Sequence, residues 1–212
     1  MAVTPATPDR SGGQPTSTAP RPRNPRGQGD RLRRDLLDSA TELMAEHGSI
    51  DKVSVRAVAA GAGVTPTAVY RHFADHDDLL WSAVEYCFDE FLAVMVEAAE
   101  RSDDPVERFR LAGRAYVSFA MEQRGKYRVM FANRVELPPR QAPVGMNAFE
   151  NLIGLVAAIL ATKNDPRDPF FVSVQVHSWI HGIVDLCGGH REMPWPDTEL
   201  LLDELGVRLG LA

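Results

Sequence analysis

Apolar residues recur at helical spacing along most of the chain from residue 30 onward. In residues 30–47 the apolar positions fall on one helical face, and Gly48 follows directly. Similar spacing predicts helices over residues 76–101, 105–121, 127–131, 146–161, 169–188 and 198–212. No stretch alternates apolar and polar residues as a half-buried strand would. With two short helices between residues 54 and 73, the pattern predicts an all-α fold of about nine helices.

These two short helices surround a glycine turn. Ser54 belongs to the residue types that cap a helix by accepting a backbone N–H bond. Gly63 stands where the chain must reverse, because glycine adopts a left-handed backbone without strain. Thr65 is suited to cap the second helix, and Pro66 fits its first position, where the N–H would have no partner. The arrangement is a helix-turn-helix, which is typical of proteins that bind double-stranded DNA.

The same segment resembles the DNA-binding domain of the TetR (tetracycline-repressor-like) transcription regulators. The family pattern is a valine and a small polar residue, then an apolar-Tyr-x-His-Phe run, and it is met by Val64, Thr65, Val69, Tyr70, His72 and Phe73. The resemblance covers about residues 30–90. It implies that the helix over residues 65–73 is the recognition helix and that a homodimer places two such helices in successive major grooves of a palindromic operator.

The helical period and this resemblance together indicate which side chains face DNA. We expect the base-reading surface at Thr65, Pro66, Thr67 and Arg71, whose methyl groups and guanidinium suit thymine methyls, guanine or phosphate. The resemblance places Tyr70 and His72 at phosphate-contacting positions, with packing as the alternative for Tyr70. Arg56 is expected on a base or a phosphate, with an ion pair to an acidic neighbour as the alternative, and Ser54 can offer its hydroxyl to a phosphate.

One position departs from the family. Just after the cap of the following helix, members often carry a lysine that holds a phosphate, whereas this chain has His76 flanked by Asp75, Asp77 and Asp78. A histidine among carboxylates is a weaker and pH-dependent cation. This contact is therefore in doubt.

Charge is divided unevenly along the chain. The net charge is −6, but residues 1–34 hold seven arginines against two aspartates, which leaves −11 for the remainder. Residues 1–29 are rich in Pro, Gly, Ser, Thr and Arg and are expected to be a disordered arm. Arg21, Arg23 and Arg26 would either follow phosphates or belong to a solvated tail. We expect the DNA-binding domain at residues 30–76 and a helical ligand-binding and dimerisation domain at residues 77–212.

The second half carries a shorter resemblance. Residues 127–131 and the Trp-Ile-His-Gly run at residues 179–182 are similar to a TetR C-terminal subtype with a Trp-His-Gly element. This implies a pocket for an unidentified small molecule. The side chains expected to line it, with ordinary core packing as the alternative, are Tyr116, Phe119, Tyr127, Met130, Phe131, Trp179 and His181. The helix over residues 169–188 is apolar nearly all round, so it must be covered on more than one side. Together with the last helix it resembles the two helices per subunit that form the family's homodimer interface, which implies a homodimer.

Other classes find less support. No apolar run reaches the length of a membrane span and no signal sequence precedes the domain, so the chain is expected in the cytoplasm. Cys87 and Cys187 suggest buried thiols, with a redox pair as the alternative. His177 and His181 have a metal-binding spacing but no third ligand, so we expect no metal and no cofactor. An enzyme using these histidines and Asp185, and a partner-binding module with a vestigial helix-turn-helix, are the rival hypotheses. A repressor released by a small, largely apolar ligand is favoured, with an activator or a regulator without a ligand as the alternatives within this class.

Overall fold

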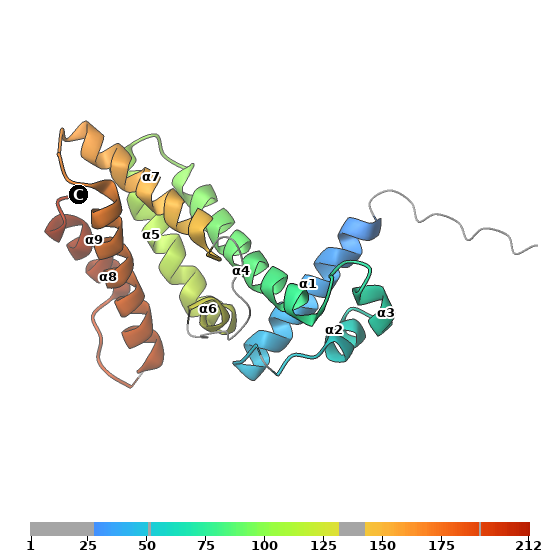
Figure 1. The fold of residues 1–212 in the computed structure, drawn as a ribbon. Helices are drawn as coiled ribbons and strands as arrows, with labels where there is room; N and C mark the ends of the chain where they lie inside the picture. The colour runs from blue at the N-terminus through green and yellow to red at the C-terminus, as the bar shows by residue number, and fades with distance from the viewer. Residues whose placement is uncertain (1–27, 51, 132–142, 191) are drawn as a thin grey trace, which may run out of the picture.

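The computed structural model describes residues 28–50, 52–131, 143–190 and 192–212. Within these ranges the chain forms helices and no strand (Figure 1). The helices are α1 (Gln28–His47), α2 (Val55–Gly61), α3 (Pro66–Val69), α4 (His76–Ala99), α5 (Pro105–Glu122), α6 (Arg124–Phe131), α7 (Met146–Thr162), α8 (Pro169–Gly189) and α9 (Thr198–Arg208). The predicted all-α fold is confirmed over these residues, as is the number of helices.

Aspartate caps fix the starts of four helices. At the start of each helix an aspartate side chain accepts a hydrogen bond from a backbone N–H group of the first turn. The capping residues are Asp75 for α4, Asp104 for α5, Asp168 for α8 and Asp197 for α9. Each cap satisfies an N–H group that the helix leaves without a partner. These starts therefore lie close to their predicted positions.

Two helix ends fall short of the prediction. The helix α4 ends at Ala99 rather than near residue 101, and α9 ends at Arg208 rather than at the end of the chain. At the second of these ends Gly210 has a φ of +69°, and the Leu211 N–H bonds back to the Gly206 carbonyl at 2.7 Å. This left-handed glycine stops the helix by the usual route.

A first hydrophobic core joins α1, α2 and α3 to the beginning of α4. Its largest fully buried side chains are Leu36, Met44, Ile50, Val53, Val58, Phe73, Leu79 and Leu80. One buried residue comes from much later in the chain, Val129 of α6, which is 1% exposed. The helix-turn-helix therefore packs on an element of the C-terminal half.

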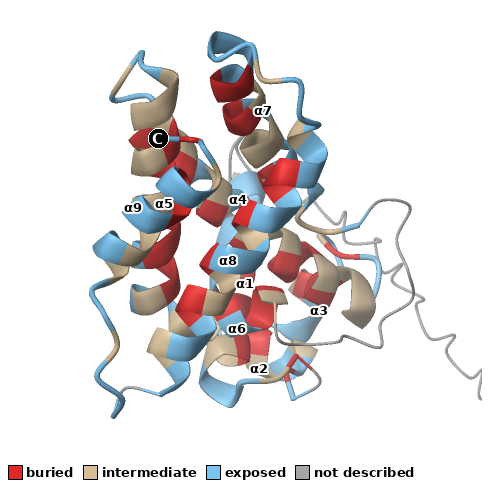
Figure 2. Ribbon diagram, turned by 90° about the vertical axis from the view of Figure 1, so that its left-hand side faces the viewer, coloured by how far each residue is buried: buried red, intermediate tan, exposed pale blue. Residues whose placement is uncertain are grey.

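A second core lies among the rest of α4 and α5 to α9 (Figures 1 and 2). Phe91 and Met95 of α4 are buried in it, whereas Leu79 and Leu80 of the same helix belong to the first core. The helix α4 thus contributes buried side chains to both cores. The boundary expected at residue 77 remains a prediction.

Two further expectations concern the whole chain. Residues 1–27, which hold almost all of the expected arm and its arginines Arg21, Arg23 and Arg26, lie outside the described residues. Among the helices that are described, none is both long enough and apolar enough to span a membrane.

Candidate DNA interface and ligand cavity

Short hydrogen bonds fix the helix-turn-helix. Ser54 caps α2 as predicted, because its Oγ accepts the Ala57 N–H bond at 3.2 Å. Ser39 of α1 donates to the Val58 carbonyl at 3.1 Å, which ties α1 to α2 inside the core. Gly63 has a φ of +67°, so the turn uses the left-handed backbone that glycine permits. The angle between the helices is therefore set by local chemistry.

The recognition helix is shorter than predicted. The expected helix over residues 65–73 is a single α-helical turn, Pro66–Val69, followed by a turn in which the His72 N–H bonds to the Val69 carbonyl at 2.9 Å. This bond between an N–H group and the carbonyl three residues earlier tightens the end of α3, as is common at helix termini. Thr65 occupies the N-cap position, but its side chain makes no capping bond, contrary to expectation. Its hydroxyl is exposed.

Most of the predicted DNA-facing residues are exposed in this motif. Ser54, Arg56, Thr65, Pro66, Thr67, Tyr70 and Arg71 are exposed, and His72 is half-buried. Tyr70 is 55% exposed, so packing does not bury its ring. Among the described residues Arg56 makes no ion pair, which leaves its guanidinium available to an anion. Contact with DNA remains a prediction for all eight residues.

His76, at the start of α4, makes an intramolecular bond. Its Nε2 lies 2.7 Å from the Val53 carbonyl, just before α2. A carbonyl oxygen only accepts, so Nε2 carries the proton in this bond. In the neutral ring Nδ1 is then an acceptor and has no hydrogen for a phosphate oxygen. Only a protonated His76 could donate to a DNA phosphate while keeping its bond to Val53. This bond is a structural reason to doubt the phosphate contact at His76.

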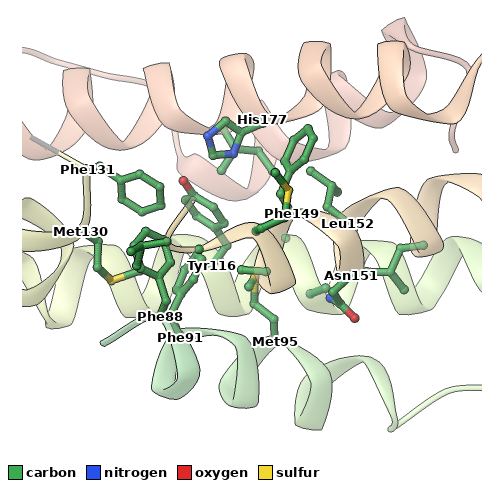
Figure 3. Close-up of a pocket in the computed structure, with 18 of the residues that line it drawn as sticks. Phe88, Phe91, Met95, Tyr116, Met130, Phe131, Phe149, Asn151, Leu152 and His177 are labelled. Atoms are coloured by element: carbon green, nitrogen blue, oxygen red, sulfur yellow. The ribbon is translucent and has the colours of Figure 1, made fainter. Parts of the chain in front are cut away.

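An apolar cavity of about 340 Å³ lies between α4, α5, α6, α7 and α8 (Figure 3). Its walls carry six aromatic side chains, Phe88, Phe91, Phe109, Tyr116, Phe131 and Phe149. The other described lining residues are mostly aliphatic or glycine, together with Asn151 and His177. This size and composition fit a small-molecule site.

The structure brings some of the seven predicted ligand residues together at this cavity and leaves others away from it. Tyr116, Met130 and Phe131 line the cavity. Phe119, Tyr127 and His181 lie behind or beside the wall, and Trp179 is 37% exposed on the outside of α8. The expectation that all seven would line one pocket is therefore too broad. Which of them touch a ligand remains a prediction.

Tyr127 and His181 belong to a hydrogen-bonded chain behind the cavity. The Tyr127 hydroxyl lies 3.0 Å from the Tyr116 hydroxyl and 2.6 Å from Nδ1 of His181. Burial raises the pKa of Tyr116 to about 12, and it raises the pKa of Tyr127 further. Both hydroxyls therefore stay protonated at neutral pH, and this wall of the cavity carries no negative charge.

His177 and His181 stack on one another along α8. Their ring centroids are 5.6 Å apart with an interplanar angle of 26°. Burial, and secondarily the His181 ring, lower the pKa of His177. In the described part of the chain no cluster of three His, Cys, Asp or Glu side chains could hold a metal. The two rings have different neighbours: His177 borders the cavity, and His181 bonds to the hydroxyl of Tyr127.

Polar contacts cross the junction between the two cores. Lys126 of α6 pairs with Glu90 of α4 at 2.7 Å. Burial and hydrogen bonds to Asp38 of α1 and to Glu90 raise the pKa of Tyr86 to about 12. The three helices are thus joined by charged and polar groups as well as by apolar packing.

The two thiols are unpaired in the structure. Cys87 is buried and Cys187 is half-buried, and neither forms a disulfide. Burial raises the pKa of the Cys87 thiol to about 12, so this thiol has little nucleophilic character at neutral pH.

Several cavity residues escaped the sequence reasoning. The helical spacing of residues 76–101 gives Phe88 and Phe91 no role beyond packing, and nothing in the sequence distinguishes Phe149 and Asn151 of α7. The signal was weak because an apolar helix face looks the same whether it borders a cavity or fills a core. His177 drew attention only for its metal-like spacing with His181.

Two family models match this chain. One, described as "Bacterial regulatory proteins, tetR family", matches residues 36–83, and the other, "Tetracyclin repressor-like, C-terminal domain", matches residues 109–207. Together they cover more than two thirds of the chain and include both the helix-turn-helix and the cavity-bearing half. Fold and site define a DNA-binding transcription regulator of the helix-turn-helix class. The chain belongs to the TetR family.

Individual proteins are also similar to this chain. An uncharacterized HTH-type transcriptional regulator of Haemophilus influenzae is 36% identical over 76 residues, which are 36% of this chain and 37% of that relative. A solved protein of unknown function from Rhodococcus sp. RHA1 is 26% identical, with a TM-score of 0.69 over 84% of this chain and 93% of the other. A TetR family transcription regulator from Marinobacter aquaeolei has the same fold, at 18% identity and a TM-score of 0.65 over 83% and 94%.

A third solved structure shares the fold. The transcriptional regulator FadR from Bacillus subtilis, in complex with stearoyl-CoA, is 18% identical and has a TM-score of 0.62 over 83% of this chain and 96% of that one.

Proposed function

We propose that the protein is a homodimeric repressor that binds a palindromic operator and leaves it when a small, largely apolar ligand enters the cavity. The observation that carries this proposal is the position of α6. Met130 and Phe131 of this helix line the cavity. Val129, the residue just before them, is buried in the first hydrophobic core, which also holds the helix-turn-helix. One short helix therefore belongs to both sites.

The fit of α6 against α1 supports mechanical coupling. At Gly125 an added Cβ would lie 3.0 Å from the Cα of Ala45 in α1, so the two helices touch at backbone distance. A ligand that displaces Met130 or Phe131 moves α6, and α1 cannot stay in place without losing this contact. Because packed interiors resist compression, such a shift reaches the recognition helix.

Release requires a difference in affinity between two states. A ligand shifts the equilibrium only by as much as it prefers the state that does not bind DNA, and DNA must disfavour the ligand by the same factor. The ligand and the operator therefore compete through the protein without touching one another.

Dimerisation is supported by apolar side chains that the single chain leaves in water. On α8 and α9 these include Phe170, Phe171, Val174, Leu186, Leu200 and Val207, of which Leu200 is 66% exposed. Pale-blue exposed ribbon follows both helices in Figure 2. An apolar surface of this kind marks an interface, and a second copy of the chain would bury it by a two-fold contact.

The stearoyl-CoA complex of FadR supports a regulator with a small-molecule effector on this fold. It does not name the effector here, since similarity at 18% identity concerns the fold. As a DNA-binding regulator without a membrane-spanning helix among its described residues, the protein would act in the cytoplasm.

A cavity-filling substitution tests the proposal without knowledge of the ligand. Ala148 of α7 is buried and lines the cavity, so Ala148→Phe should imitate a bound ligand and lower operator affinity at least about tenfold. Ala158→Phe, on an exposed position of the same helix, is the matched control and should bind as the wild type does. Fluorescence anisotropy with the DNA upstream of the gene measures both. A folded Ala148→Phe variant with unchanged operator affinity would contradict the coupling.

The direction of control needs its own measurement. In transcription of the upstream promoter in vitro, the added protein should lower the amount of transcript. An increase would identify an activator instead.

A further inference from the structure

On the premise that the cavity is the effector site of the proposed repressor, we propose that its ligand is an uncharged, ring-bearing molecule that exchanges a hydrogen bond with His177. This narrows the effector to a chemical class. Carboxylates, phosphates and ammonium groups are excluded from the cavity itself.

The charge of the walls supports the first part. None of the described lining residues is Asp, Glu, Lys or Arg. A buried carboxylate without a cationic partner loses its hydration and gains nothing in return, so an ionised ligand would bind poorly.

Two arginines of α5 line a different cavity. Arg110 and Arg114 line a second cavity of about 270 Å³ between α5 and α9. There Arg110 is paired with Glu107 at 2.7 Å and with Asp203 at 3.4 Å, and Arg114 is paired with Glu199 at 2.5 Å. Both guanidinium groups thus already have carboxylate partners, and neither lines the first cavity.

His177 is the polar side chain best placed to read the ligand. Its ring lies beside the cluster of phenyl rings in Figure 3 and packs against the rings of Tyr116, Phe131, Phe149 and His181. No hydrogen bond joins it to any described residue. The Tyr116 hydroxyl, in contrast, already bonds to Tyr127.

The protonation state of His177 decides what it recognises. Burial lowers its pKa, so the ring is neutral at physiological pH and offers one N–H donor and one acceptor nitrogen. A hydroxyl or a carbonyl group satisfies such a ring. A carboxylate could accept the N–H bond, but only the imidazolium form would also neutralise its charge, and this environment disfavours that form.

The volume of the cavity and its aromatic walls fit a ring system. A cavity of about 150 Å³ holds one benzene, so about 340 Å³ suits a fused bicyclic core with a small substituent. Phe91 already meets Tyr116 edge to face at 4.8 Å and Phe119 at 5.2 Å, which leaves ring edges and faces of this kind around the space. Aromatic ligands gain from both geometries.

Three probes of equal ring size test the proposal by isothermal titration calorimetry on the full chain at about pH 7.5. Methyl 2-naphthoate is neutral and has a carbonyl, 2-naphthoate is its anion, and 2-methylnaphthalene lacks a polar group. The ester should bind at least about tenfold more tightly than the anion and several-fold more tightly than the hydrocarbon.

Variants assign the preference to the imidazole. His177→Leu should abolish the advantage of the ester over the hydrocarbon, and His177→Gln, which keeps a donor and an acceptor, should retain part of it. His190→Leu removes an exposed histidine at the end of the same helix and should bind all three probes as the wild type does. Circular dichroism of each variant shows whether it is folded, and His177→Gln keeps the test informative if His177→Leu is not.

The result that overturns the inference is binding of the anion as tight as that of the ester, or no measurable binding of any probe. Operator release is measured separately by anisotropy. If the ester binds and the operator is not released, the ligand class stands and the proposed repressor mechanism fails. If the anion binds and releases the operator, the mechanism stands and the ligand class fails.

Discussion

Gly125 of α6 and Ala45 of α1 meet so closely that neither position has room for a larger side chain. An added Cβ at Gly125 would lie 3.0 Å from the Ala45 Cα and 3.2 Å from its carbonyl oxygen. Because α6 also contributes Met130 and Phe131 to the cavity, this crossing joins the ligand half to the DNA-binding half at backbone distance.

The crossing can be tested with two identical substitutions. Gly125→Ala should lower the free energy of unfolding by about 1–3 kcal/mol, because the new methyl group must push the two backbones apart. Gly154→Ala, in α7, has open space around the added Cβ and should stabilise the helix by up to about 1 kcal/mol. Urea unfolding of both variants measures the difference. Equal stabilisation by the two substitutions would show that α1 and α6 are not in tight contact.

The hydrogen-bonded chain of Tyr116, Tyr127 and His181 predicts that the loss of one hydroxyl group lowers the free energy of unfolding. Tyr127→Phe removes the hydroxyl that bridges Tyr116 and His181, and it leaves a buried polar group on each without its partner. We expect a loss of about 1–3 kcal/mol in the free energy of unfolding. Tyr70→Phe, at an exposed ring, should change it by less than about 0.5 kcal/mol. Similar values for the two variants would mean that the buried chain adds nothing to stability.

The lowered pKa of His177 predicts a pH dependence. Its ordinary value is 6.5, and burial followed by the nearby His181 lowers it in the folded protein. Above about pH 6.5 the ring is neutral in both states; below it the unfolded chain binds a proton that the folded protein does not. The free energy of unfolding therefore falls as the pH drops below about 6.5. His177→Leu should flatten this part of the profile, and an unchanged slope would contradict the assigned environment.

The proposed dimer predicts sensitivity to charge on α9. Val207 is 63% exposed in the single chain, and Val207→Glu would place two carboxylates in the interface. We expect the dissociation constant of the dimer to rise at least about 100-fold in analytical ultracentrifugation. Val94→Glu, at an exposed apolar position of α4, is the control and should leave the dimer intact. A Val207→Glu variant that remains dimeric would place the interface elsewhere.

Local signals explain why the helix-turn-helix was predictable from sequence. Ser54 caps α2 and Gly63 turns the chain because each effect depends on a few neighbouring residues. The length of α3 was wrong because the turn after Val69 tightens where the helical period still continues. The bond between His76 and the Val53 carbonyl joins positions 23 residues apart, and no local pattern announces it.

The cavity was only partly predictable for a related reason. Periodicity placed Tyr116 on an inward face, and the family resemblance singled out Met130 and Phe131, but neither could separate a cavity wall from a filled core. Trp179 was chosen from a family resemblance, and it lies on the outer side of α8, where the proposed dimer would cover it. Space left empty between five helices is a property of the whole packing rather than of any one segment.

The central claim is sequence-specific DNA binding by the helix-turn-helix, and fluorescence anisotropy with the duplex upstream of the gene tests it most directly. The protein should bind this duplex at least about 10³-fold more tightly than a shuffled one. Arg56→Ala should weaken binding about 10- to 100-fold, while Arg101→Ala, at the end of α4 in an exposed pair with Glu97, should have no effect. Equal affinity for both duplexes, unchanged by Arg56→Ala, would contradict the account.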